Sequence, residues 1–106
     1  MKILKDIIPE KMWSCGVVLD NLGVKEVAWD FFDVMKVIDI LKQKRYTILG
    51  GDVYKMKDDK IEITYDNWYI DRNIATVENS IEKAEEYIEF YHQKQGEGYL
   101  YTLIIG

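Results

Sequence analysis

Two segments of alternating apolar and polar residues, separated by a short charged stretch, lie within residues 49–69. After the charged stretch, Ile61, Ile63 and Tyr65 alternate with polar residues, which is the period-two pattern of a strand with one buried face. The segment before it is rich in β-forming residues. Residues 57–60, Lys-Asp-Asp-Lys, suit a four-residue connection, because aspartate tolerates turn geometry. The sequence therefore predicts a β-hairpin, with strands over about residues 46–56 and 60–70.

A glycine doublet, Gly50 and Gly51, interrupts the first of these strands. Glycine within a strand lowers its stability and offers no side chain to pack. It therefore marks either a β-bulge or the close approach of another element. A bulge at this place would also aim Asp52 at a partner.

Two helices are predicted on either side of the hairpin. The first covers residues 30–45, with Asp30 as a suitable N-cap. Because apolar residues occupy most of its circumference, this helix should be covered by the sheet and the N-terminal segment together. The second covers residues 77–93 after Thr76 as its cap. One of its faces is apolar, and the opposite face is acidic, which is typical either of a solvated surface or of an acidic docking surface. The acidic residues are Glu78, Glu82, Glu85, Glu86 and Glu89.

The element order is helix, strand, strand, helix, strand, the last strand covering residues 99–105. It predicts an α+β fold, a small two-layer domain with a mixed three-stranded sheet packed by helices. A strand–helix–strand crossover makes the last strand run parallel to the second one. We prefer the order in which the first strand lies between the other two, antiparallel to both, with the helices on one face. Because the chain has 106 residues and is 48% apolar, residues 1–106 should form a single domain.

Charge and composition limit the classes of function that the chain can have. The net charge is −5 and the acidic excess lies in the second half of the chain, which argues against binding to nucleic acid. No apolar run is long enough for a membrane span, and the run in residues 1–6 is too short for a signal peptide, so we expect a cytoplasmic protein. Cys15 is the only cysteine, which fits a reducing compartment, and we expect it to be a buried, inert thiol.

No catalytic motif is visible in the sequence. It contains no phosphate-binding loop and neither of the metal signatures CxxC and HExxH, so we expect neither a cofactor nor enzymatic activity. Asp52, Asp66 and Asp71 form a disfavoured candidate for a site that binds a hard cation. The alternative to a non-enzymatic protein is a small ligand-binding or enzymatic α+β domain that uses Asp52, Asp66 and the tyrosines around a pocket.

The residues of the hairpin resemble a known family. Residues 48–54 read ILGGDVY and residues 65–69 read YDNWY; VAW at 27–29 precedes them and SIEKAEEYI at 80–88 follows. From about residue 24 to the end, the chain resembles the immunity protein 40 family of bacterial polymorphic toxin systems. It departs from the family at residues 57–60, where more glycine is expected, and at Ile70, where cysteine is frequent.

The resemblance implies a non-enzymatic protein that binds and neutralises a cognate toxin domain, by steric and electrostatic blockade. The toxin would be its protein partner, with no nucleic acid or membrane involved, and the chain itself would be a monomer or a weak dimer. The expected partner-binding residues are Asp52, Tyr54, Asp66, Asn67, Trp68 and Tyr69. Two alternatives remain open: these residues serve the fold, with Trp68 in the core, or the interface lies on the acidic helix or a variable loop.

Overall fold

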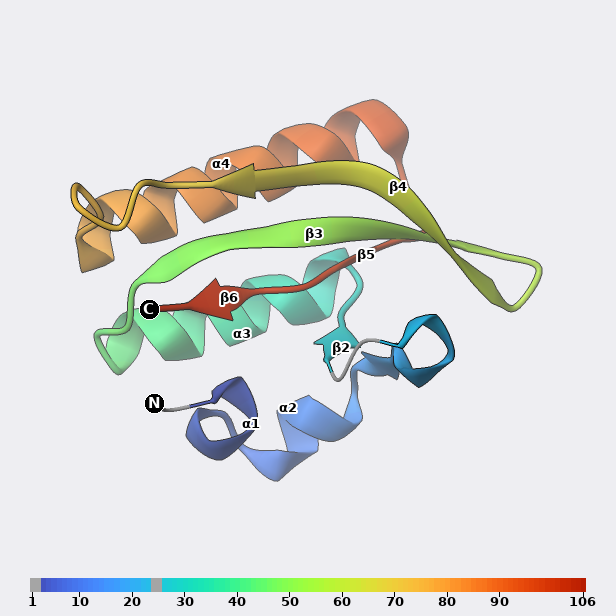
Figure 1. Ribbon diagram of the computed structural model, residues 1–106, viewed down its shortest axis with the longest axis horizontal. Coiled ribbons are helices and arrows are strands. Elements are labelled where there is room, and N and C mark those ends of the chain that lie inside the picture. The colour runs from blue at the N-terminus through green and yellow to red at the C-terminus, as the bar shows by residue number, and fades with distance from the viewer. Residues whose placement is uncertain (1–2, 24–25) are drawn as a thin grey trace.

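A long antiparallel hairpin forms the centre of the computed structural model, which describes residues 3–23 and 26–106 (Figure 1). Its strands are β3 (Ile48–Lys57) and β4 (Lys60–Tyr69). Lys57 pairs with Lys60, so only Asp58 and Asp59 form the loop. Both have positive φ, 51° and 63°, as a type I′ turn requires. The hairpin prediction is confirmed, whereas the predicted four-residue connection is wrong because both lysines belong to the strand ladder.

The other edge of β3 pairs with the end of the chain. The strands β5 (Tyr99–Tyr101) and β6 (Ile104–Ile105) both lie antiparallel to β3, so the order is β4-β3-β5 with β6 beside β3. The α+β class and the preferred central position of the first hairpin strand are confirmed. Two details differ from the prediction: the last strand is divided in two, and every strand pair in the described ranges is antiparallel. The sheet is not mixed, because β3 separates the two strands that run parallel.

Two helices cover one face of this sheet, α3 (Phe31–Gln43) and α4 (Val77–Gln95), and both lie behind the sheet in Figure 1. Their apolar sides and the sheet bury one continuous core. The helical pattern identified both elements, but α3 ends two residues earlier than predicted, where Arg45 has a φ of 64°. Fully buried side chains of this core include Trp29, Val34, Val37, Ile38, Leu41, Ile48, Ile88 and Tyr101.

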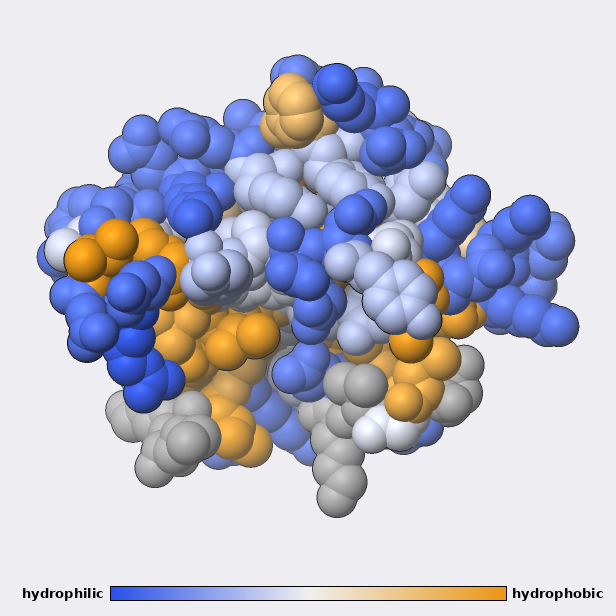
Figure 2. Space-filling model, turned by 45° about the horizontal axis from the view of Figure 1, so that its top comes forward, coloured by the Kyte–Doolittle hydropathy of each residue, from blue (hydrophilic) through white to orange (hydrophobic). Residues whose placement is uncertain are grey.

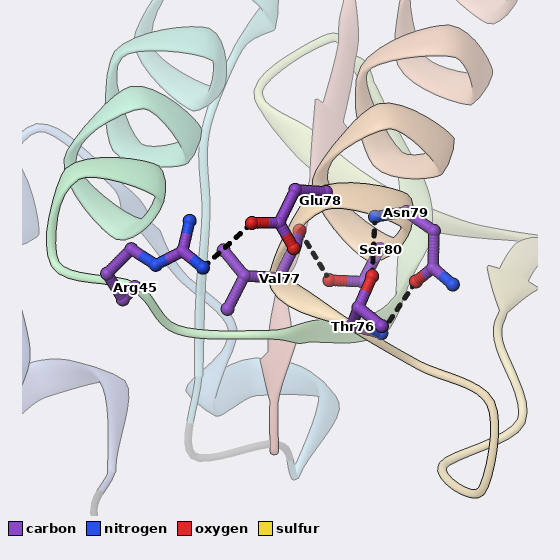
Figure 3. A network of polar contacts seen from close by, with 6 residues as sticks. All are labelled: Arg45, Thr76, Val77, Glu78, Asn79 and Ser80. Atoms are coloured by element: carbon purple, nitrogen blue, oxygen red, sulfur yellow. Dashed lines mark hydrogen bonds and ion pairs between the residues drawn. The ribbon is translucent and has the colours of Figure 1, made fainter.

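Polar contacts fix the start of each helix. Asp30 accepts a hydrogen bond from the Asp33 amide at 2.8 Å, as an N-cap does. Thr76 and Asn79 cap α4 reciprocally, at 3.0 and 2.7 Å (Figure 3). Inside the first turn of α4, the buried Ser80 hydroxyl accepts a hydrogen bond from the Ile48 amide at 3.0 Å, which joins this helix to the first residue of β3.

The N-terminal segment packs against two parts of the fold: Ile7 and Ile8 join the main core with α3, whereas Leu19 and Ala28 cover part of the opposite face of the sheet. It contains α1 (Leu4–Ile7), α2 (Glu10–Ser14), the paired strands β1 (Val17–Val18) and β2 (Val27–Ala28), and a 3-10 turn, Asp20–Leu22. Pro9 separates the two short helices. Leu19 and Ala28 pack with Tyr54 and Leu100 in a second, smaller cluster. The sheet is therefore covered on both faces where Tyr54 and Leu100 lie.

Two expectations about this segment need comment. Cys15 is exposed, so the prediction of a buried thiol is wrong; it follows α2, whose residues are all at least partly exposed. The expectation that residues 1–6 form no signal peptide falls partly on Met1 and Lys2, which lie outside the described residues. Among residues 3–23 and 26–106, no helix combines the length and the hydropathy needed to cross a bilayer.

Candidate partner-binding surface

The pairing of β3 with β4 is interrupted beside the residues that the sequence singled out. Asp52 lies opposite Asn67, but Tyr54 lies opposite Ile63, so Val53 alone faces three residues of β4. This β-bulge therefore comprises residues 64–66 of β4 rather than the glycine doublet of β3. A bulge turns side chains away from the regular alternation of the strand.

Local hydrogen bonds hold the bulge in place. The Thr64 hydroxyl donates to the Val53 carbonyl at 2.7 Å and accepts from the Asp66 amide at 3.0 Å. Between them, Tyr65 has a φ of 67° and its side chain is 84% exposed. A tyrosine in this conformation is unusual, and backbone strain of this kind concentrates at functional sites. Sequence analysis placed Tyr65 in the strand and did not select it as a site residue, because positive φ has no signal in the residue type.

The glycine doublet has a different explanation, which is the close approach of other elements. A Cβ on Gly51 would meet the Trp68 ring and the backbone carbonyl of Thr102, and a Cβ on Gly50 would meet the Trp68 carbonyl. Of the two features predicted for the doublet, close approach is the one that the contacts with Trp68 support. A register shift does occur beside Gly50, but towards β6, between Ile48 and Gly50.

Two of the six predicted site residues are buried. Trp68 is 6% exposed, and its ring stacks on Tyr87 of α4 with a centroid distance of 4.9 Å. Tyr54 is 7% exposed and packs under the N-terminal segment. Burial raises the pKa of Tyr54, and the nearby carboxylates Asp52 and Glu26 raise it further. Both side chains contribute to the core and present little surface to a partner.

Asp66, Asn67 and Tyr69 are exposed, and Tyr69 retains 73% of its surface. The Asp66 carboxylate accepts a hydrogen bond from the Tyr91 hydroxyl of α4 at 2.8 Å. Desolvation and this hydrogen bond raise the pKa of Tyr91, so its hydroxyl stays a donor over the whole neutral range. Asp66 is thereby held at the edge where β4 meets α4. Asn67 lies on the next position, where alternation turns its side chain to the other face of the sheet.

Asp52 is half-buried and borders a shallow depression of about 190 Å³. The depression opens at the bulge, and its lining includes Tyr65, Asp66 and Asn67. Beside Asp52 lies Glu26, whose pKa is raised by burial and by the charge of Asp52. Glu26 was not among the predicted site residues, because nothing in the order of residues places position 26 beside position 52. The hairpin thus brings four of the predicted residues, Asp52, Tyr54, Asp66 and Asn67, to one depression.

The alternative surfaces and sites can also be located. The acidic residues of α4 face outward; Glu78 pairs with Arg45 at 2.7 Å, and its own backbone amide and then Arg45 lower the pKa of Glu78 (Figure 3). A cation site at Asp52, Asp66 and Asp71 gains no support. Within the described part of the chain, no group of three carboxylate, histidine or cysteine side chains is arranged to hold a metal ion.

The side of the molecule that carries β4 and α4 faces the viewer in Figure 2. Side chains of intermediate hydropathy, the range of tyrosine and tryptophan, gather in its middle, with hydrophobic groups beside them. The tyrosines that belong to these two elements are Tyr65, Tyr69, Tyr87 and Tyr91. Together with Asp52, Asp66 and Asn67, the exposed Tyr65 and Tyr69 are called the hairpin surface below.

Comparison with known proteins supports one family. The family model described as immunity protein 40 matches residues 18–105, which extends from the end of β1 to the end of β6. The match begins several residues earlier than the resemblance inferred from motifs, and it includes the buried residues of both clusters except Ile7 and Ile8. Comparison with curated proteins and with solved structures gives no match.

Proposed function

Because the chain belongs to the immunity protein 40 family, we propose that it binds a cognate bacterial toxin domain in the cytosol and neutralises it. Binding would cover the toxin's active site or the approach of its substrate. The chain would act by binding alone, without catalysis of its own.

The observation that carries this proposal is the pair of exposed tyrosines on the hairpin surface. Tyr65 and Tyr69 project from a strand that is backed by a helix, and they flank the charged Asp66 and the amide of Asn67. Tyrosine gives much contact area for little loss of side-chain entropy and dominates many interfaces. The carboxylates of Asp66 and Asp52 would pair with basic groups of the toxin and accelerate the encounter.

Tyr54 and Trp68 take a different part in this proposal. Because their side chains are buried, they would support the hairpin surface from within rather than contact the toxin. Trp68 fixes β4 against α4 through Tyr87, and Tyr54 fixes β3 against the N-terminal segment. The interface itself would need about 800 Å² from this chain, so residues around the hairpin surface would contribute as well.

Calorimetric titration tests the proposal, with the C-terminal domain of the large protein encoded next to this gene as the ligand. We expect one-to-one binding with a dissociation constant on the order of nanomolar. Tyr69→Ala should weaken binding about tenfold or more, as expected when a central aromatic anchor is truncated. Glu86→Gln, which removes an exposed charge from α4, serves as the matched control for the acidic helix.

Each outcome selects one surface. Weaker binding by Tyr69→Ala together with unchanged binding by Glu86→Gln supports the hairpin surface, and the reverse pattern moves the interface to α4. Undiminished toxin activity in the saturated complex would contradict the proposed blockade. No heat at micromolar concentrations of two folded proteins would remove this neighbour as the partner.

A second candidate is a ligand-binding or enzymatic site at the depression beside Asp52. It is favoured by one observation, the half-buried Glu26 beside Asp52, since burial and the charge of Asp52 raise the pKa of Glu26, and a carboxyl of raised pKa can serve as a general acid. Asp52→Asn separates the two functions. In an enzyme it would abolish turnover without loss of stability, whereas in a binding protein it would change only the affinity for the partner.

We further propose that the chain is a monomer or at most a weak dimer. β4 is an edge strand of the sheet and could in principle pair with a second copy. The bulge at residues 64–66 interrupts its ladder, and lysine occupies the strand end at Lys60, both of which disfavour edge pairing. Light scattering at increasing concentration should give the monomer mass, and a stable dimer mass would contradict this proposal.

A further inference from the structure

A pocket of about 280 Å³ lies at the opposite end of α4 from its cap. It forms where the start of α3, the end of α4 and the link between α4 and β5 meet. Aromatic rings and two carboxylates make up its wall, and the lining residues include neither lysine nor arginine. These residues are Asp30, Phe31, Phe32, His92, Glu97 and Tyr99, with Gly96 and Gly98.

The aromatic rings of this pocket pack against one another. Phe31 stacks on His92 with a centroid distance of 3.9 Å and an interplanar angle of 8°. Phe32 stands edge-on to both, at 5.4 Å from Phe31 and 6.2 Å from His92. Phe32 is 64% exposed, although it is a large apolar side chain next to a well-packed core. Because Phe32 lines this pocket, a ligand bound there would cover the exposed ring.

The wall opposite these rings is fixed as well. Gly96 and Gly98 have φ of 79° and 92°, which lets three residues connect α4 with β5. The Gly98 carbonyl accepts from the Met56 amide at 2.8 Å, so the link is tied to β3. Glu97 lies between the two glycines with an exposed carboxylate. The pocket is therefore preformed and does not need a loop to order before it can accept a ligand.

Charge and ring chemistry determine what this pocket can hold. The carboxylates of Asp30 and Glu97 and the carbonyl end of α4 favour cations over phosphates and other anions in this pocket, and they act against the amide end of α3, which Asp30 caps. Aromatic faces attract cations within about 6 Å. One of the rings already does so: Lys55 Nζ lies 5.8 Å from the centroid of Tyr99. A planar guanidinium satisfies both features, because it stacks on rings and pairs with carboxylates in one plane, which a compact, strongly hydrated ammonium does less well.

We propose that this pocket binds the guanidinium of an arginine side chain presented by a partner protein. An arginine within a chain fits better than the free amino acid, since the carboxylate of the free amino acid would be repelled by Asp30 and Glu97. The volume also lies just below the range of about 300–1,000 Å³ typical of sites for larger small molecules. The proposal does not depend on the hairpin surface, and its test uses no toxin.

The test is an NMR titration of the ¹⁵N-labelled protein with N-acetyl-arginine methylamide, compared with the lysine and citrulline analogues. Citrulline keeps the shape of arginine without its charge. The arginine compound should shift the amides of Phe31, Gly96 and Gly98 saturably, with a dissociation constant in the millimolar range that is typical of a few weak contacts. Citrulline should bind about tenfold more weakly, because it loses both the carboxylate pairing and the cation–π attraction.

Four variants locate the binding. Glu97→Gln and Phe32→Ala should each weaken it about two- to fivefold, as expected for one exposed ion pair or one ring. Asp30→Asn removes a charge while asparagine keeps the N-cap, so it should weaken binding without unfolding α3. Glu82→Gln removes an equal charge elsewhere on α4 and should leave binding unchanged. Equal shifts with citrulline and arginine, an equal loss in Glu82→Gln, or no saturable shift at these amides would each overturn the proposal.

Discussion

Ser80→Ala should destabilise the protein although the change removes a single oxygen atom. The Ser80 hydroxyl is completely buried and is the acceptor for the amide of Ile48, which is completely buried too. Without this acceptor, a buried N–H group is left unpaired, at a cost of about 1–3 kcal/mol. Alanine recovers about 0.5 kcal/mol through its higher helix propensity. The loss of the bond from Ser80 to the Val77 carbonyl adds little, since a helical carbonyl has a second partner along the helix.

The net expectation is a loss of about 0.5–2.5 kcal/mol in the free energy of unfolding, or roughly 2–20 °C in melting temperature for a domain of this size. Urea denaturation followed by circular dichroism measures it, with an unchanged m-value as the sign that only stability has changed. Glu82→Ala, on the exposed face of the same helix, controls for helix propensity and should lose almost nothing. If Ser80→Ala were as stable as the parent, the Ile48 amide would not depend on Ser80 and the tie between α4 and β3 would be refuted.

Three further predictions follow from the hairpin and its surroundings. Burial and Asp52 raise the pKa of Glu26, so its protonated carboxyl stabilises the fold at low pH and loses that contribution as pH rises from 4.5 through the raised pKa. Glu26→Gln should therefore have a higher melting temperature than the parent at pH 7. The difference between the two melting temperatures should shrink below pH 4.5. A gap that is constant with pH would contradict the shifted pKa. Gly51→Ala should lower the unfolding free energy by about 1–3 kcal/mol in urea, because its methyl group overlaps the Trp68 ring, and an unchanged midpoint would contradict the close approach. Tyr91→Phe combined with Asp66→Asn in a double-mutant cycle should show a coupling of about 0.5–1.5 kcal/mol, and additive losses would mean that the 2.8 Å bond is not formed in solution.

The elements that the sequence identified are those whose signals are local. The alternation around Ile61 and Ile63 and the helical spacing after Asp30 and Thr76 each depend on residues a few positions apart, and they predicted the hairpin and both long helices. The predicted turn was too long. Lys57 can pair with Lys60 only because Asp58 and Asp59 both have positive φ, and aspartate permits this conformation without predicting it.

Features that depend on distant segments were not accessible in this way. In the second buried cluster Leu19 packs with Tyr54, and the raised pKa of Glu26 depends on Asp52. The residues around one member of each pair give no signal of the other member. The same holds for the bulge opposite Val53, because its position depends on how β4 pairs with β3. The glycine doublet indicated only the other irregularity, which lies beside Gly50 in the pairing of β3 with β6.

The stretch from Tyr65 to Tyr69 shows why a motif cannot be read as a binding site position by position. Asp66 and Trp68 turn towards α4, where they meet Tyr91 and Tyr87. Asn67 and Tyr69, at the alternate positions, turn away from α4. One short segment thus carries a buried side chain that holds the fold, Trp68, between exposed side chains that can meet a partner. A Trp68→Ala variant would consequently lose binding through loss of stability, whereas Tyr69→Ala changes an exposed side chain and leaves the core intact. Comparing the two at equal fraction folded is what separates a contact with the toxin from a contribution to the fold that presents it.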